Sequence, residues 1–247
     1  MIRILLLPLF LFIFFSSPGL LAQDITANEL LSRAIAYHDP DNAWSTFSGT
    51  LFITMETPNN SERKSEVTLN FPADYFKLVV RKDDTTTEEV IDKGVCSLIV
   101  NGKKIKNKAI DSSNTPKPCP TTEMMRNYYT YLYGLPMKLR DKGTLVDPAV
   151  LKKTIKGKEY LTLKVKYEEE VGKDTWYFYF NPDNYALEVY QFFHDEAAND
   201  GEYIILEADH FEIVDGIRIP KKRSWYTNKE DRLLGTDILT RVSKKTE

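Results

Sequence analysis

Histidine is the side chain that most often serves metal binding or acid-base catalysis near neutral pH, and the sequence contains three of them. If the loop after His194 reverses the chain, His210 lies on the returning strand about 20 Å away, because a strand rises about 3.3 Å per residue. These two side chains therefore cannot share a metal ion. His38 stands in a His-Asp-Pro-Asp sequence, whose Asp and Pro residues are common turn formers. We expect no metal site and no catalytic residue among the histidines.

Other catalytic and cofactor motifs are missing from the sequence. It has no GxSxG, GxGxxG, P-loop, HExxH or CxxC pattern. Its acidic clusters, Glu88-Glu89 and Glu168–Glu170, fall at expected strand ends or edges, where exposed charge opposes edge-to-edge aggregation. We therefore predict a protein that is not an enzyme and that uses no cofactor.

A short basic run, Lys221–Arg223, lies in the C-terminal part of the chain. If the strands on either side of the preceding Asp-Gly turn pair without a bulge, Lys222 lies opposite Asp209. The same register sets Trp225 opposite Leu206. Two interpretations remain open: the run belongs to a paired strand face, or it anchors an anionic head group.

The sequence has more large apolar side chains than are needed to fill one buried face of a sheet. The stretch Trp176–Phe180 places aromatic rings on both faces of its expected strand. Since one face of an antiparallel sheet normally meets water, another element must cover the second face. A helix rich in Met and Tyr is the obvious cover, because these side chains make adaptable, amphipathic linings. The candidate ligand-binding residues are Met124, Met125, Tyr128, Tyr129, Trp176, Phe178 and Trp225.

Two helices are expected to position these residues. Thr26 and Glu29 form a capping box at the start of the first helix, which ends near Tyr37. The second helix begins at about Thr122 and is ended by a glycine. It belongs to a helical excursion, residues 106–158, that interrupts the strand pattern.

Most of the remaining sequence alternates apolar and polar residues with a period of two, as strands with one buried face do. One series runs from Trp44 to the Asn101-Gly102 turn, and a second runs from Tyr160 to Val242. Short connections require antiparallel neighbours, since a parallel pair needs a crossover of about a dozen residues or more. The pattern predicts a mainly β fold of the α+β type with roughly ten or eleven strands.

The first 22 residues contain one charged side chain, Arg3, followed by a dense apolar run and then Pro18 and Gly19. This pattern is typical of a secretory signal peptide, and the run is shorter than the roughly 20 residues that a membrane-spanning helix needs. We predict cleavage after Ala22, no transmembrane segment after cleavage, and a single domain over residues 23–247. The product is expected to be exported, periplasmic and soluble, without a lipid anchor, because no cysteine follows the cut.

The charge balance argues against nucleic acid as a partner. Without the leader and its one basic residue, the chain carries 32 Lys and Arg against 36 Asp and Glu, a net charge of −4. Nucleic-acid binders neutralise phosphates with an excess of basic residues, which is lacking here.

The chain has two cysteines, Cys96 and Cys119. An even count in an exported protein indicates a disulfide. A bond between them would close a loop of 24 residues and contribute about 3 to 4 kcal/mol in the chain-entropy model. A redox or metal pair would need C-x-x-C spacing or nearby histidine ligands, which the sequence does not provide.

Several turns and strand ends carry a resemblance. The motifs are Tyr37-His38-Asp39-Pro40, Trp44, Tyr179-Phe180-Asn181-Pro182 and Val214–Pro220. With the leader, the β-meanders and the helical excursion, they resemble an uncharacterised family of exported bacterial proteins that is similar to the periplasmic lipoprotein-carrier (LolA/LolB-like) superfamily. The resemblance implies an open, curved antiparallel half-barrel, covered by helices, over an apolar cavity that holds acyl chains. The carriers' functional arginine and lid positions have no matched counterpart in this sequence.

The leading hypothesis is a periplasmic binding or carrier protein that sequesters a hydrophobic or acylated ligand, a lipid or lipoprotein, without catalysis. The alternative is an envelope protein-interaction or stress-sensing module, whose cavity is filled by its own side chains and whose partners are envelope proteins. An enzyme acting on a lipid or glycan is the least favoured hypothesis, because it would need a histidine or an acid pair inside the cavity.

Overall fold

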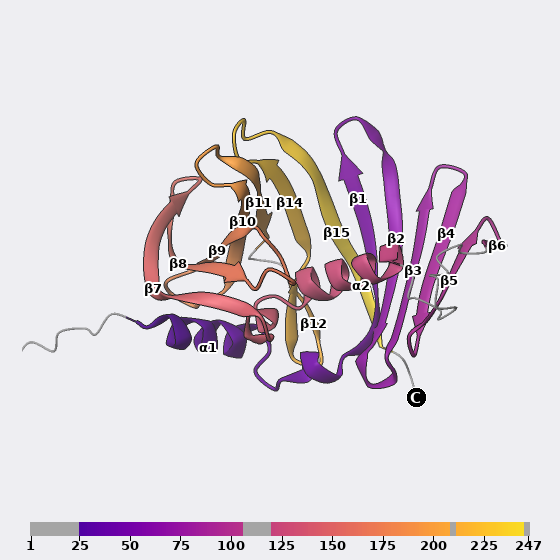
Figure 1. Cartoon of the computed structure of the whole chain (residues 1–247), viewed down its shortest axis with the longest axis horizontal. Coiled ribbons are helices and arrows are strands. Elements are labelled where there is room, and N and C mark those ends of the chain that lie inside the picture. The colour runs from indigo at the N-terminus through magenta and orange to yellow at the C-terminus, as the bar shows by residue number, and fades with distance from the viewer. Residues whose placement is uncertain (1–24, 106–119, 208–210, 245–247) are drawn as a thin grey trace, which may run out of the picture.

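A 13-stranded sheet dominates the computed structural model, which describes residues 25–105, 120–207 and 211–244 (Figure 1). The helices are α1 (Ala27–His38) and α2 (Pro120–Tyr133), with short 3-10 helices η1 (Ala43–Thr46), η2 (Phe71–Ala73) and η3 (Met137–Arg140). The sheet contains β1 (Ser48–Thr57), β2 (Asn60–Asn70), β3 (Tyr75–Lys82), β4 (Thr85–Asp92), β5 (Val95–Val100), β6 (Lys103–Ile105), β7 (Thr144–Ile155), β8 (Lys158–Tyr167), β9 (Thr175–Phe180), β10 (Leu187–Asp195), β11 (Asp200–Leu206), β14 (Lys222–Thr227) and β15 (Leu233–Lys244). A separate hairpin is formed by β12 (Phe211–Val214) and β13 (Ile217–Pro220).

The strand order explains why a helix crosses the sheet. Neighbouring strands run β6-β5-β4-β3-β2-β1-β15-β14-β11-β10-β9-β8-β7. The consecutive strands β6 and β7 therefore lie at opposite edges. The chain between them must pass from one edge to the other, and α2 lies in this connection, across the inner face of the curved sheet (Figure 1).

The curvature follows from interruptions in the strand pairing. The register shifts between Phe52 and Ile53 of β1 and between Val146 and Val150 of β7. Such bulges bend a strand and increase its twist. All pairings in the described sheet are antiparallel. The predicted mainly β fold, an open and curved antiparallel half-barrel covered by helices, is confirmed.

The sheet is larger than the ten or eleven strands expected from the sequence. Strand β7, Thr144–Ile155, occupies residues that the sequence placed in the helical excursion. Its alternation of buried and exposed positions is broken at Asp147, Pro148 and Ala149, where the register shifts against β8. This bulge hides the period of two that identifies a strand.

Both helices were anticipated. Helix α1 begins after Thr26, whose hydroxyl oxygen accepts a hydrogen bond from the Glu29 backbone N–H at 3.2 Å. Its buried residues Leu30, Leu31 and Ala34 lie on one side of the helix and belong to the main core. Helix α2 covers the expected segment and extends two residues further toward the N-terminus, to Pro120.

The outer face of the sheet carries a second, smaller hydrophobic cluster, which consists of Tyr160, Tyr177, Tyr179, Val189, Phe193 and Tyr203. Lysine side chains cover part of it: the Nζ atom of Lys153 lies 4.1 Å from the ring centroid of Tyr177. The expected helix therefore covers only one of the two aromatic faces of Trp176–Phe180. Helix α2 lies on the face of Trp176 and Phe178. Lys153 and Lys164 lie on the other face, where they make cation–π contacts with Tyr177.

The register around the basic run also differs from the expectation. Trp225 pairs with Ile204, and Leu206 pairs with Arg223. The β12–β13 hairpin keeps Phe211 opposite Pro220, and extending that register would set Arg223 opposite residue 208. The pairing therefore shifts by two residues between the hairpin and β11–β14, and an even shift leaves each side chain on its expected face. Asp209, the expected partner of Lys222, lies outside the described residues.

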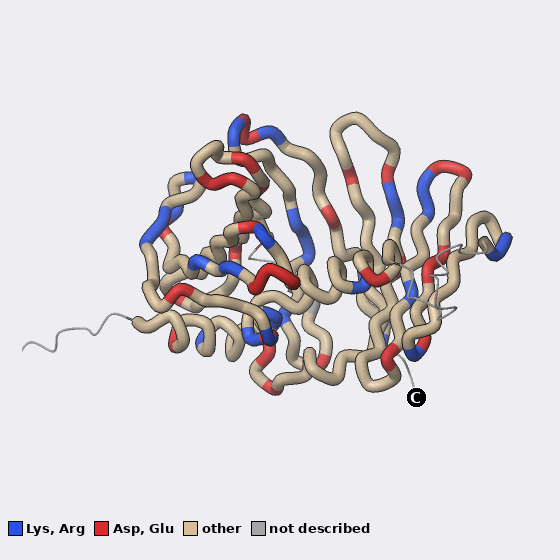
Figure 2. The backbone as a smooth tube through the Cα atoms, viewed as in Figure 1, with Lys and Arg blue, Asp and Glu red and all other residues tan. Residues whose placement is uncertain are grey.

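Acidic and basic residues are interspersed along the backbone of the fold (Figure 2). In the described part of the chain, no helix has the length and apolar character needed to cross a membrane. The expected signal peptide, residues 1–22, lies outside the described residues, as does Cys119. Cys96 is half-buried on β5, and the disulfide stays a prediction.

Candidate functional site

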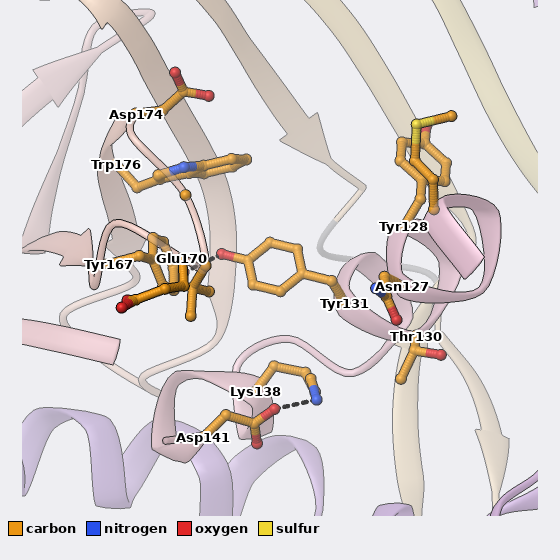
Figure 3. A pocket seen from close by; sticks show the side chains of 13 residues that line it. Asn127, Tyr128, Thr130, Tyr131, Lys138, Asp141, Tyr167, Glu170, Asp174 and Trp176 are labelled. Atoms are coloured by element: carbon orange, nitrogen blue, oxygen red, sulfur yellow. Dashed lines mark hydrogen bonds and ion pairs between the residues drawn. The ribbon is translucent and has the colours of Figure 1, made fainter. Parts of the chain in front are cut away.

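A cleft of about 780 Å³ lies between α2 and the ends of β8 and β9. Its volume falls in the range of roughly 300 to 1,000 Å³ that is usual for small-molecule sites. Helix α2 supplies one wall, and residues from η3, from β8 and from the connection to β9 supply the other (Figure 3). The lining residues are Met124, Asn127, Tyr128, Thr130, Tyr131, Lys138, Asp141, Tyr167, Glu170, Val171, Gly172, Asp174 and Trp176.

Aromatic side chains form the deeper part of the cleft. Tyr131 extends from α2, and its hydroxyl forms a hydrogen bond with the hydroxyl of Tyr167 on β8 (Figure 3). The Tyr131 ring also meets Trp176 edge-on, with 5.7 Å between ring centroids. Trp176 packs in turn against Phe192 at 4.9 Å. These contacts tie the helix to three neighbouring strands.

The tyrosines of this wall are uncharged at physiological pH. Burial raises the pKa of Tyr131 well above its ordinary value. Burial also raises the pKa of Tyr167 to about 12, although the hydrogen bond from Tyr131 acts in the opposite direction. The deeper wall of the cleft is therefore aromatic and neutral.

Charged side chains gather at the rim of the cleft. Lys138 and Asp141 form an ion pair at the end of η3 (Figure 3). The carboxylate of Asp174 lies 2.7 Å from Nδ1 of His194, and this hydrogen bond raises the pKa of His194. Glu170 adds a further carboxylate. A neutral aromatic wall with an ionic rim is suited to an amphiphilic ligand.

The structure brings together some of the predicted ligand-binding residues. Met124, Tyr128 and Trp176 line the cleft. Tyr129 and Phe178 are almost completely buried in the core, and Met125 packs against that core. Trp225 lies behind Tyr128, with the two rings stacked at 6.4 Å between centroids. A ligand role for any of the seven residues stays a prediction.

Helix α2 is held to the sheet near both ends. The Thr122 hydroxyl donates a hydrogen bond to Oε2 of Glu89 on β4 at 2.7 Å. At the other end, Arg223 of β14 donates through Nη2 to the backbone carbonyl of Leu132 at 3.4 Å. Its guanidinium carbon also lies 3.9 Å from the ring centroid of Tyr133. A cation at a helix C-terminus is electrostatically favourable.

Polar side chains gather on the inner face behind Tyr128. Arg223 lies opposite Asp237 in the strand register, Asp237 lies opposite Met55, and Met55 lies opposite Arg63. Trp225 follows two residues after Arg223 and meets Tyr190 edge-on, at 6.4 Å between centroids. We call the following residues the buried polar cluster: Arg63, Tyr133, Tyr190, Arg223, Trp225 and Asp237.

The two histidines that the structure describes, His38 and His194, form hydrogen bonds to neighbouring protein groups. His38 is fully buried; its Nε2 accepts a hydrogen bond from the Leu187 N–H, and its Nδ1 donates to the Arg218 carbonyl, each at 3.0 Å. His210 lies outside the described residues. Within residues 25–105, 120–207 and 211–244, no group of three or more His, Cys, Asp and Glu side chains could hold a metal ion.

Sequence reasoning missed two kinds of residue at this site. Tyr131 lies three positions after Tyr128 and so shares its helix face, a spacing that could have selected it. Asp237 occupies an inward position of β15 between the buried residues Gly235 and Leu239. A polar residue at an inward position of an alternating strand was the available signal.

Comparisons with known proteins give the family of the chain and a similar fold. A family model described as "Family of unknown function (DUF6503)" matches residues 4–242, whereas no curated protein matches the sequence. A LolA superfamily protein from Nitrosomonas europaea superposes with a TM-score of 0.52 at 10% identity, over 90% of this chain and 95% of that one. MucB in complex with MucA(peri) gives a TM-score of 0.28 at 12% identity, over 88% of this chain and 55% of MucB. The first similarity shows a LolA-like fold and confirms the expected lipoprotein-carrier-like architecture; the second is too weak to support an argument.

Proposed function

The chain belongs to the DUF6503 family of unknown function, and we propose that it binds an amphiphilic or acylated ligand in the cleft beside α2 and carries or sequesters it without catalysis. The cleft itself is the observation that carries the proposal, because a volume of about 780 Å³ is combined with a neutral aromatic wall and a charged rim. The LolA-like fold supports it, since the lipoprotein-carrier resemblance implies acyl chains held over the inner face.

The energetics of such binding follow from the apolar surface that the ligand buries. Each buried methylene contributes about 0.8 kcal/mol, so ten of them contribute about 8 kcal/mol. Association costs roughly 4 to 15 kcal/mol in lost freedom, and a short chain therefore gains little net affinity. Each methylene that enters the cleft should tighten binding about fourfold until the cleft is filled.

Chain-length dependence provides the test. The delipidated protein is titrated with fatty acids from eight to eighteen carbons, followed by calorimetry and native mass spectrometry. We expect the dissociation constant to fall with chain length and then to reach a plateau. The proposal is abandoned if no fatty acid, phospholipid or lipopeptide is taken up.

Two matched variants locate the binding. Met124 lines the cleft and is 59% exposed, whereas Val95 is 71% exposed on β5, outside the cleft lining. Both positions tolerate a charge without disturbing a core. Met124→Glu should weaken palmitate binding at least tenfold, and Val95→Glu should leave it unchanged. Equal effects of the two substitutions would mean that the ligand lies elsewhere.

An interaction module with a self-filled core is the alternative, and one observation favours it. Helix α2 itself fills part of the inner face, because Tyr129, Leu132 and Tyr133 are each at least 96% buried. In that case the delipidated protein takes up none of the alkyl probes and instead retains an envelope protein in a pull-down from periplasmic extract.

We also propose that the protein acts in the periplasm after removal of residues 1–22. The apolar leader supports export, and Cys96 and Cys119 suit an oxidising compartment. N-terminal sequencing of the exported protein should begin at Gln23. Retention of the full-length chain in the cytoplasm would contradict this location.

A further inference from the structure

We propose that the buried polar cluster is a subsite for the anionic head group, a carboxylate or a phosphate, of the ligand that the cleft takes up. The inference rests on the proposed function, because a head group reaches this position only as part of a bound amphiphile. It adds the chemical class of the ligand and the residues that would select it.

The polar groups of the cluster are only partly paired within the chain: Arg223 donates through Nη1 to the Pro220 carbonyl and through Nη2 to the Leu132 carbonyl. Arg63 and Trp225 are half-buried, and the other four members are buried. Tyr190, Arg223, Tyr133 and Asp237 have exposed fractions of 0%, 1%, 2% and 3%. Within the described chain, six of the cluster's polar atoms have no hydrogen-bond partner: Arg63 Nε, Tyr133 OH, Tyr190 OH, Arg223 Nε, Trp225 Nε1 and Asp237 Oδ1. Buried polar atoms in folded proteins are normally paired. Their accumulation in one place indicates that a group from outside the chain completes the pairing.

The strand register places these atoms side by side. Arg223 and Asp237 are directly opposite on β14 and β15, and Arg63 lies two strands further along the same row, beyond Met55. Tyr133 reaches the cluster from α2, with its ring under the Arg223 guanidinium. The cluster therefore joins four strands of the inner face, β2, β10, β14 and β15, to the helix that covers them.

The unpaired atoms select a negatively charged acceptor. The nitrogens of Arg63, Arg223 and Trp225 only donate hydrogen bonds, whereas the ionised Asp237 carboxylate only accepts them. The two guanidinium groups outnumber the one carboxylate, so the cluster has a positive excess. Arginine forms strong charge-assisted hydrogen bonds with carboxylates and phosphates. Burial raises the pKa of Asp237, whereas the nearby charges of Arg63 and Arg223 act in the opposite direction.

Only one aromatic layer separates the cluster from the cleft. Tyr128 lines the cleft, and its ring stacks on that of Trp225. Trp176 also lines the cleft, and its ring centroid lies 6.3 Å from that of Tyr190. A head group bound in the cluster would thus leave its alkyl chain directed into the cleft, past the Tyr128 ring.

The sequence left two interpretations of the basic run Lys221–Arg223 open, a paired strand face and an anchor for an anionic head group. In the structure, different residues of the run fit each of them. Lys222 is exposed and pairs with Glu207 at 3.3 Å, as expected of a paired strand face. Arg223 points inward and is 99% buried, as an anchor would be. The head-group interpretation therefore concerns Arg223 alone.

Three C16 probes that differ only in the head group test the proposal: palmitate, hexadecyl phosphate and hexadecanol, with inorganic phosphate as a fourth titrant. We expect both anionic probes to bind at least tenfold more tightly than hexadecanol, and inorganic phosphate to bind at least a hundredfold more weakly than hexadecyl phosphate. Equal binding of free and alkylated phosphate would overturn the head-group assignment in favour of a free-anion site.

Variants that remove only a hydroxyl group test the subsite with little risk of unfolding the protein. The double variant Tyr133→Phe/Tyr190→Phe removes two unpaired hydroxyls, so its thermal midpoint should be unchanged or higher while its preference for anions falls at least fivefold. Arg223→Met should abolish the preference. Tyr179→Phe is the matched control, because its hydroxyl donates to Gln191 on the outer face.

The possible results distinguish failure of the head-group subsite from failure of the proposed carrier function. If hexadecanol binds as tightly as palmitate, or if the double variant and Arg223→Met both keep the anion preference, the subsite is refuted and the carrier function stands. If none of the alkyl probes binds, the proposed function fails together with the subsite. Loss of preference in the cluster variants alone, with hexadecanol affinity retained, supports the assignment.

Discussion

Acidification should destabilise this protein through His38, which joins α1 to two other elements. The imidazole is fully buried, and its Nε2 accepts the Leu187 N–H while its Nδ1 donates to the Arg218 carbonyl. Burial lowers its pKa from 6.5 to about 4, and the nearby charges of Arg218 and Arg223 act in the same direction. Protonation would also put a hydrogen on Nε2, which then could no longer accept from Leu187.

The sign and size of the effect follow from this pKa. Because the folded-state pKa lies below the unfolded value, His38 binds a proton more readily after unfolding. Its contribution to stability is complete above pH 6.5 and is lost as the pH falls toward 4. A difference of about 2.5 pKa units corresponds to about 3 kcal/mol. This is a large share of the roughly 5 to 15 kcal/mol that stabilises a typical domain.

Urea unfolding between pH 7.5 and 4.5 measures this contribution in the wild type and in His38→Gln. Glutamine offers a neutral acceptor that does not titrate. The variant should therefore be less stable at pH 7 but lose about 2 to 3 kcal/mol less than the wild type on acidification. Parallel curves for the two proteins over this interval would refute the reasoning.

His194 supplies the matched control, because its linkage has the opposite sign. Its hydrogen bond to Asp174 raises its pKa, so its contribution is present at low pH and is lost as the pH rises through the folded value. His194→Gln should therefore make the acid loss of stability steeper. Flattening of the curve in His194→Gln would show that the geometry has been assigned to the wrong histidine.

Three further results are expected. Tyr131→Phe removes the hydroxyl that bonds to the neighbouring tyrosine of β8, and it should lower the free energy of unfolding by about 1 kcal/mol in urea titrations, with a larger loss contradicting a neutral hydrogen bond. Phe178→Ala opens a cavity at a fully buried position and should lower the free energy of unfolding by about 3 to 5 kcal/mol. Met124→Ala, at the exposed wall of the cleft, should lower it by less than about 0.5 kcal/mol. Similar losses in the two variants would show that the two positions are packed alike. If Cys96 and Cys119 are bonded, the intact mass of the exported protein should rise on reduction and its stability should fall by about 3 to 4 kcal/mol, and an unchanged mass would rule out the bond.

The fold could be predicted because its signals are local. The capping box at Thr26, the Met/Tyr helix and the Asn101-Gly102 turn each depend on residues within a few positions of one another. Asn101 and Gly102 both have positive φ values, 49° and 75°, as the tight turn requires. Strand β7 was missed for the same reason, since its bulge at Asp147 disrupts the local period.

The candidate site was only partly predictable because its contacts join distant parts of the chain. The periodicity of α2 placed Met124, Met125, Tyr128 and Tyr129 on one broad helix face, and of these Met124 and Tyr128 line the cleft. It could not show that Phe178 faces the same way but lies beneath other side chains. Burial depends on which elements pack above a residue, and that information is absent from the alternation of a single strand.

The buried polar cluster supports the proposed carrier function over the interaction module that the sequence left as an alternative. A core that serves only stability has no use for unpaired polar atoms, because each one costs about 1 to 3 kcal/mol when it is buried without a partner. Replacing such groups with apolar residues of similar shape is often neutral or stabilising. The cluster around Arg223 and Asp237 is therefore difficult to explain in a self-filled interaction module, and it is consistent with a site that an anionic ligand completes. Because palmitate is expected to bind more tightly than hexadecanol, it should raise the thermal midpoint more at the same free ligand concentration.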